Sequence, residues 1–234
     1  MVRPICSALS IAFLVALVPG YAAAQPADDV VRSAIVAVAA VSPEGRVCAA
    51  ATAFHVGGGR FFTNAHVVGL LRRGTREGCR LWFVMQARET RLPDYPIALV
   101  RVACVDPRYK ETPDATVAPF DVAVLEVQEL GVGERLPPAL VFDPRMPRPG
   151  EAVRVVGFPA STEPVRFDIR GLVGDVSRTV FLVDNRTPGA IPGVSGSPVL
   201  DGTGRVIGIV FGVNVGARRT AAVPIPTALE RCRP

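Results

Sequence analysis

A stretch rich in proline and glycine at residues 128–150 divides the sequence into two halves. Proline and glycine interrupt helices and strands, so a run of them is typical of a connection that crosses a protein surface. In each half, short apolar segments alternate with turn-forming residues, which is the pattern of β-strands rather than of long helices. Two strand-rich halves with little helix predict an all-β protein built from two packed β-barrels.

The same pattern sets the expected bounds of the domains and elements. We predict a first barrel over residues 25–130, a linker over 131–150 and a second barrel over 151–234. A helix is expected at 65–71 and a short C-terminal helix at 226–232. The expected strands are 34–41, 47–56, 60–63, 80–86, 97–105 and 121–127 in the first half, and 152–157, 165–173, 179–183, 198–200, 205–213 and 220–223 in the second.

The first 24 residues have the organisation of a secretory signal peptide. Arg3 gives a positively charged start, and residues 8–18 form an apolar run that is too short to span a bilayer. Small residues at 22–24 supply a cleavage pattern, with the cut predicted after Ala24. We therefore expect an exported protein, periplasmic or extracellular, with no stable membrane insertion once this segment is removed.

Four cysteines remain after such a cut, and an even number in an exported chain predicts two disulfides. Three connectivities are possible. The segments 80–86 and 97–105 read as a symmetric hairpin, which would place Cys79 opposite Cys104. That pairing leaves Cys48 with Cys232, and the spacings are too wide and irregular for a zinc site.

The charge pattern excludes several classes of protein. The formal net charge is +5, but the basic residues, nearly all arginines, are scattered singly along the chain. A nucleic-acid-binding protein more often has a basic stripe with interleaved aromatic residues. With two histidines and no spaced set of ligands, a metal enzyme is not expected either.

Any mechanism that depends on histidine must use His55 or His66. His55 lies inside a predicted strand, where a structural role is the better interpretation. His66 follows the end of a strand and lies in the first turn of the predicted helix, where Thr63 or Asn64 is expected to cap the helix. That junction suits a side chain that points into a cleft.

Ser195 is the best candidate for a nucleophile. It lies between Gly193 and Gly196 just before an apolar strand, so the chain can turn tightly and expose the hydroxyl. The N–H groups of Gly193 and Ser195 could then form an oxyanion hole. Ser197 lies next to a proline and is the weaker candidate. The nucleophile elbow of α/β-hydrolases does not fit, because position 197 is not glycine and no histidine follows Ser195.

Asp121 is the candidate acid that would orient the histidine. It stands at the start of the apolar segment 121–127, where backbone donors can hold a carboxylate. The competitors Asp106 and Asp114 are better interpreted as a turn former and a solvated acid.

Together these segments resemble the trypsin-like serine peptidases, and among them bacterial branches similar to HtrA and to the glutamyl endopeptidases. The matching segments are TNAHVV (63–68), DVAVLEV (121–127) and GVSGSPVLDGTGRVIGIVFG (193–212). Weaker similarity at 51–56 and 149–159 extends the resemblance over residues 33–232.

The resemblance implies two six-stranded antiparallel β-barrels, with a cleft between them and no cofactor. Ser195 would attack the scissile carbonyl of a protein or peptide, His66 would act as base and then acid, and Asp121 would hold His66. The substrate would lie along the strand 208–213 and beside 220–223, and the implied contacts are Gly208, Ile209, Val210, Phe211, Thr220 and Ala221. Because no acid occurs near Gly189, we expect cleavage after a small or aliphatic residue rather than after arginine or lysine.

Three features depart from the family pattern. Val194 stands where trypsin relatives carry aspartate and HtrA relatives carry asparagine, so activation by burial of a new N-terminal amine is not expected. The cysteines do not match the bridge that usually flanks the catalytic histidine, and no room is expected for a PDZ domain. A trypsin-fold binding protein with little catalysis and an incidental esterase are the alternative interpretations.

Overall fold

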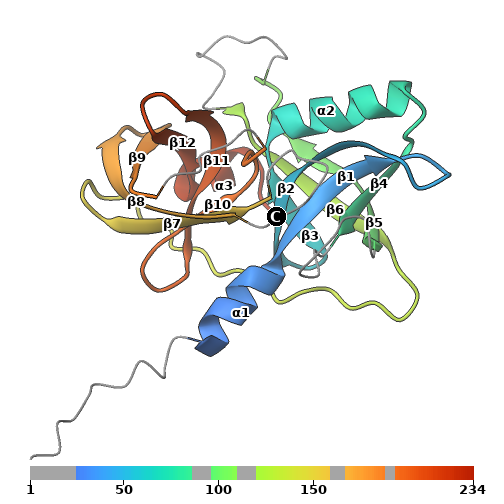
Figure 1. Cartoon of the computed structure of the whole chain (residues 1–234), viewed down its shortest axis with the longest axis horizontal. Helices are drawn as coiled ribbons and strands as arrows, with labels where there is room; N and C mark the ends of the chain where they lie inside the picture. Colours follow the sequence, from blue (N-terminus) through green and yellow to red (C-terminus); the bar gives the residue numbers. More distant parts are fainter. Residues whose placement is uncertain (1–24, 86–95, 110–119, 159–166, 188–192) are drawn as a thin grey trace, which may run out of the picture.

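The computed structural model describes residues 25–85, 96–109, 120–158, 167–187 and 193–234. The predicted signal peptide and Asp114 lie outside these residues. The described part forms two closed barrels side by side, the first in blue to green and the second in yellow to red (Figure 1).

The first barrel closes in the order β1-β2-β3-β6-β5-β4, with every pairing antiparallel. The interior holds alternate side chains of these strands, including Val38, Phe61 and Leu125, all fully buried. Its strands are β1 (Ile35–Val41), β2 (Val47–Gly57), β3 (Arg60–Thr63), β4 (Leu81–Met85), β5 (Pro96–Val105) and β6 (Ala123–Leu130).

The second barrel closes in the corresponding order, β10-β11-β12-β9-β8-β7, and is also antiparallel throughout. Its strands are β7 (Ala152–Gly157), β8 (Phe167–Val176), β9 (Phe181–Asn185), β10 (Pro198–Leu200), β11 (Val206–Asn214) and β12 (Arg219–Pro224). Two six-stranded antiparallel barrels confirm the predicted fold class.

In the described part of the chain, three helices accompany the barrels: α1 (Gln25–Ala34), α2 (Ala65–Arg76) and α3 (Ile225–Arg231). The C-terminal helix was expected, but α1 was not, and α2 is longer than the predicted 65–71. Helix α2 continues because it packs on the first barrel, where Gly74 leaves room for Ala40: a β-carbon at Gly74 would lie 3.0 Å from the Ala40 β-carbon. None of the helices among the described residues has the length and apolar character needed to cross a membrane.

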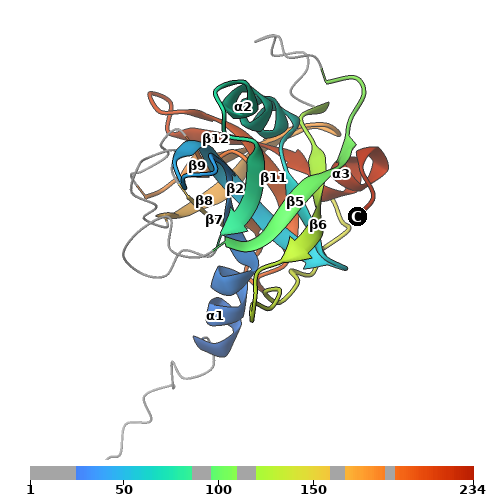
Figure 2. The same cartoon turned by 90° about the vertical axis from the view of Figure 1, so that its right-hand side faces the viewer.

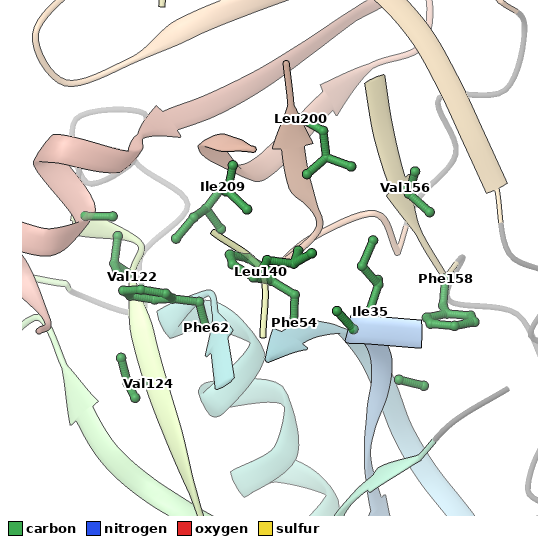
Figure 3. Packing of buried hydrophobic residues seen from close by; sticks show 14 of the residues in the cluster. Ile35, Phe54, Phe62, Val122, Val124, Leu140, Val156, Phe158, Leu200 and Ile209 are labelled. Carbon is green, nitrogen blue, oxygen red and sulfur yellow. The ribbon is translucent and has the colours of Figure 1, made fainter. Parts of the chain in front are cut away.

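An apolar cluster joins the outer faces of the two barrels (Figure 3). Phe54 and Phe62 of the first barrel lie with ring centroids 5.9 Å apart and face Ile209 of the second. Burial of each such side chain contributes roughly 1.5–3 kcal/mol relative to exposure. Other labelled members are Ile35, Val122, Val124, Leu140, Val156, Phe158 and Leu200. This inter-barrel cluster fixes how the two barrels sit against each other.

The disulfides join Cys48 to Cys79 and Cys104 to Cys232, so the predicted pairing is wrong. Helix α2 lies over the first barrel and returns the chain to Cys79 beside the start of β2, which carries Cys48. Cys104 lies on β5, and α3 packs on β11 and β12 with its C-terminal end toward the first barrel (Figure 2), where Arg231 lies 3.6 Å from Asp106 and Cys232 meets Cys104. The hairpin argument failed because β4 and β5 pair with Phe83 opposite Leu99, a register that would place Ala103 rather than Cys104 opposite Cys79.

Helix α1 is fastened to the second barrel by a charged network. Asp28 accepts hydrogen bonds from Arg32 on the same helix and from Arg154 on β7. Arg154 also binds Asp168 on β8 through two hydrogen bonds of 2.7 and 2.5 Å, and Arg32 lies 3.5 Å from the same carboxylate. The hydrogen bond from Arg154 holds the pKa of Asp28 below its usual range, and Arg32 adds to the effect.

We expect the two disulfides to differ in their contribution to stability. The Cys104–Cys232 bridge closes a sequence separation of 128 residues and the Cys48–Cys79 bridge one of 31. Chain-entropy scaling with loop length then predicts a loss larger by about 1 kcal/mol when the long bridge is removed by a double serine substitution. Urea unfolding measures the two losses, and recovery of a Cys79–Cys104 peptide after non-reducing digestion would contradict the connectivity.

Asp28→Asn should weaken the attachment of α1 by about 0.5–1 kcal/mol near neutral pH, as is usual for a partly exposed ion pair. Because the folded-state pKa of Asp28 is lowered, this stabilisation is complete above the unfolded-state pKa and is lost as the pH falls through the folded-state value. The difference in free energy of unfolding between wild type and variant should therefore stay constant from neutral pH to mildly acidic pH and then shrink. A difference that grows on acidification would be inconsistent with this network.

Candidate active site

His66 lies in the first turn of α2, immediately after the end of β3. Asn64 occupies the N-cap position with an extended backbone (φ −94°, ψ 156°), but its side chain does not cap the helix. Instead, Asn64 Nδ2 donates a hydrogen bond of 2.8 Å to the main-chain carbonyl of Asp121. The hydroxyl of Thr63 donates to the carbonyl of Thr52 at 2.8 Å. The expectation that Thr63 or Asn64 caps α2 is therefore wrong.

Asp121 takes the capping role from a separate segment, just before β6. Its Oδ1 accepts the main-chain N–H of His66 at 2.8 Å, and its Oδ2 lies 2.5 Å from His66 Nδ1. The carboxylate is 5% exposed and lies just before β6, beside the start of α2. A negative charge there also complements the positive end of the helix dipole. One buried carboxylate thus fixes both the start of the helix and the orientation of the imidazole.

This contact determines which ring nitrogen of His66 can act. A carboxylate accepts hydrogen bonds, so the neutral imidazole carries its proton on Nδ1 and leaves Nε2 as the acceptor. The side chain of His66 is 33% exposed, whereas that of Asp121 is 7% exposed. The imidazole of His66 is therefore fixed through Nδ1 by a buried carboxylate, while the ring itself stays partly exposed.

Ser195 lies in a tight turn before β10. Gly193 and Gly196 adopt φ values of 104° and 85°, a region that side chains rarely tolerate. The turn is held by main-chain hydrogen bonds: Gly196 N–H donates to Val210 at 2.9 Å, and Ser197 N–H donates to Val194 at 3.0 Å. Thr52 N–H on the first barrel donates to the Ser195 carbonyl at 3.2 Å.

Two main-chain donors of this turn are free of protein partners. Within the described residues, neither Gly193 N–H nor Ser195 N–H donates a hydrogen bond. Unpaired N–H groups two residues apart on a glycine-containing turn are the kind of donors that stabilise an oxyanion.

Val194 contributes to the turn by packing rather than by charge. It is 1% exposed and belongs to the apolar interior of the second barrel, with Val199 and Val210. The position that carries a polar residue in related peptidases is thus part of the barrel core.

The six residues expected to contact substrate differ in exposure. Ile209 and Val210 are fully buried, and Gly208 faces the Phe181 ring so closely that an added β-carbon would lie 2.4 Å from it. Thr220 is also fully buried, and its hydroxyl donates to Asn185 Oδ1 at 3.1 Å.

Phe211 and Ala221 are partly exposed. Phe211 lies at a register irregularity between β11 and β12. Of the six residues, Phe211 and Ala221 are therefore the two that reach the surface, and the other four are buried.

Among the described residues, those weighed as alternatives to the three candidate catalytic residues are buried within the fold. His55 is 5% exposed, and the centroid of its ring lies 4.9 Å from that of Phe61. Within the described residues, neither ring nitrogen of His55 has a hydrogen-bond partner. Asp106 is 1% exposed and is bound by Arg108 at 2.9 Å. Ser197 is fully buried. Among the described residues no cluster of histidine, cysteine, aspartate or glutamate side chains could hold a metal ion.

Sequence reasoning missed the role of Thr52 and assigned the wrong role to Asn64, and both residues build this region. Both are fully buried polar residues, and both bind main-chain groups of segments far away in the sequence. The small-residue segment 51–56 was noted only as a weak similarity, and nothing in it shows which main-chain groups a threonine would meet.

Comparison with known proteins places this geometry in a family. The model of the trypsin-like peptidase domain matches residues 51–209, which is more than half of the chain. Serine protease Rv3671c of Mycobacterium tuberculosis is 31% identical over 123 residues, covering 47% of this chain. The chain spans only 30% of the length of that relative.

Solved structures show the same fold. Crystal structures of Rv3671c in its inactive and active forms superpose with TM-scores of 0.62 and 0.59 at 22% identity, each covering 88% of this chain and 90% and 82% of theirs. The serine endoprotease from Yersinia pestis gives a TM-score of 0.62 at 18% identity, covering 87% of this chain and 64% of that one. The family match and the two-barrel fold agree, and the chain belongs to the trypsin-like peptidase domain family.

Proposed function

We propose that this protein is an exported serine endopeptidase that hydrolyses peptide bonds through His66, Asp121 and Ser195. The observation that carries the proposal is the Asp121 carboxylate, which binds both the main chain and the ring of His66 at 2.8 and 2.5 Å. A histidine held in this tautomer is what activation of a serine hydroxyl requires.

The proposed reaction has two halves. In the first, Ser195 Oγ attacks the scissile carbonyl carbon while its proton passes to His66 Nε2, and the C–N bond breaks as the imidazolium gives that proton to the leaving amine. In the second, water attacks the acyl-enzyme with His66 again taking the proton, and Ser195 leaves with it. The free N–H groups of Gly193 and Ser195 would stabilise the negative oxygen in both halves.

The proposed substrates are proteins or peptides. Phe211 and Ala221 offer apolar, partly exposed contacts beside the turn that carries Ser195. Such contacts suit a small or aliphatic residue before the cut and discriminate between similar side chains only modestly.

Export is supported by two features of different kinds. The first 24 residues have a charged start, an apolar run and small residues at the expected cut. The chain also contains two disulfides, which persist in oxidising compartments and are rare in the cytosol.

A fluorophosphonate probe tests the nucleophile directly. We expect it to label the purified protein at Ser195, with labelling abolished in Ser195→Ala and strongly reduced in His66→Ala. Ser197→Ala is the matched control, because its buried hydroxyl has no hydrogen-bond partner among the described residues and its removal should leave labelling within about twofold of wild type. A folded wild type that is never labelled would refute the enzyme and favour a binding role.

Asp121→Asn should lower kcat by about 10³–10⁴-fold with a small effect on folding. Asparagine Oδ1 can still accept the His66 N–H, but its amide donates toward Nδ1. The imidazole would then carry its proton on Nε2 and could not accept the serine proton. Steady-state kinetics with circular dichroism as a folding check measures this, and a loss below tenfold would mean that Asp121 does not orient the base.

A further inference from the structure

Thr52 lies on β2 where the first barrel meets the second, and it is fully buried. Its N–H donates to the Ser195 carbonyl at 3.2 Å, and its own carbonyl accepts the Thr63 hydroxyl at 2.8 Å. Thr63 lies three residues before His66. Thr52 is therefore bonded both to the nucleophile and to the segment that leads to the base.

The hydroxyl of Thr52 makes a further connection to the second barrel. Its oxygen accepts the Phe158 N–H at 2.9 Å and lies 3.3 Å from the Phe158 carbonyl, to which it donates. Phe158 directly follows β7 and is itself buried in the inter-barrel cluster. A hydroxyl is the one small group that can satisfy a donor and an acceptor at the same point.

Two glycines allow these close approaches. A β-carbon at Gly196 would lie 2.0 Å from the Thr52 carbonyl oxygen and 2.6 Å from the Thr63 hydroxyl. A β-carbon at Gly157 would lie 2.9 Å from the Thr52 hydroxyl and 2.0 Å from that of Ser197. Two segments of the second barrel therefore lie in close contact with Thr52, one at its carbonyl oxygen and the other at its hydroxyl.

We propose that Thr52 is a positioning residue that sets the Ser195 turn relative to His66 across the junction of the two barrels. The proposal rests on the proposed function, because it assigns a role within the same site. Within the described residues Thr52 bonds to the Ser195 turn, to the end of β7 and to the end of β3. With Val194 in the apolar core, these bonds take the place of an ionic contact beside the nucleophile.

The expected effect is on the rate rather than on binding. The N–H of Thr52 binds the carbonyl of Ser195, and none of the hydrogen bonds of Thr52 within the described residues involves Phe211 or Ala221. Displacement of a catalytic group by about 1 Å can cost on the order of 100-fold in rate, even when substrate binding is unaffected. Loss of the Thr52 hydroxyl also removes its two hydrogen bonds to the main-chain N–H and C=O of Phe158, which favours a shift of that segment.

The test compares Thr52→Val and Thr52→Ser with Thr227→Val. Thr227 is 3% exposed and its hydroxyl donates to the Arg178 carbonyl at 2.6 Å, so Thr227→Val removes an equally buried hydroxyl from α3. The readout is inactivation by a fluorophosphonate, resolved into the limiting rate constant kinact and the half-saturation constant KI, with unfolding midpoints measured in parallel.

We expect Thr52→Val to lower kinact by about 10- to 100-fold with KI changed by less than about threefold. Thr52→Ser should recover most of the wild-type rate, and Thr227→Val should keep it despite a comparable loss of stability. Wild-type kinact in folded Thr52→Val, or an equal loss in Thr227→Val, would overturn the proposal while leaving the peptidase intact.

A wild type that does not react would instead overturn the proposed function, and this inference with it. If Thr52→Val does not fold, Thr52→Ala and Thr227→Ala provide the same comparison with less crowding at the junction. Their rates are interpreted in the same way.

Discussion

The contact between the two closed barrels is the constraint on which the rest of this structure depends. His66 and Asp121 come from the first barrel, whereas Ser195 precedes β10 of the second. Neither barrel alone carries all three. Their relative position is set by the inter-barrel apolar cluster and, at its edge, by the hydrogen bonds of Thr52. The apolar contacts supply most of the attraction and the hydrogen bonds supply direction, because apolar burial has no preferred geometry.

Within the first barrel, the carboxylate of Asp121 combines a structural and a proposed chemical role. The first N–H groups of a helix have no partner within the helix, and Asp121, just before the neighbouring strand β6, satisfies that of His66 in α2. The same side chain orients the imidazole. The position of the base is therefore tied to the start of the helix, and a change at Asp121 affects both.

The fold and the three proposed catalytic residues could be predicted from the sequence because each has a local signature. Alternating apolar segments indicate strands, and a serine between glycines indicates an exposed turn. Helix α1 could not be predicted, because what holds it is ion pairing of Asp28 and Arg32 with β7 and β8. The disulfide pairing failed for a related reason, since it depends on how α2 packs on the first barrel and on where the end of α3, which packs on the second barrel, meets β5. Thr52 has no signature, because its partners on the second barrel, Phe158 and Ser195, lie 106 residues or more away along the chain.

A pre-steady-state measurement with p-nitrophenyl acetate tests the central claim most directly, namely that Ser195 is activated across the barrel junction to form an acyl-enzyme. The account predicts a rapid burst of p-nitrophenolate with an amplitude approaching one per protein molecule, followed by slower turnover, and no burst in Ser195→Ala. Slow, linear release at the same rate in wild type and Ser195→Ala would contradict it, because the hydrolysis would then owe nothing to this serine.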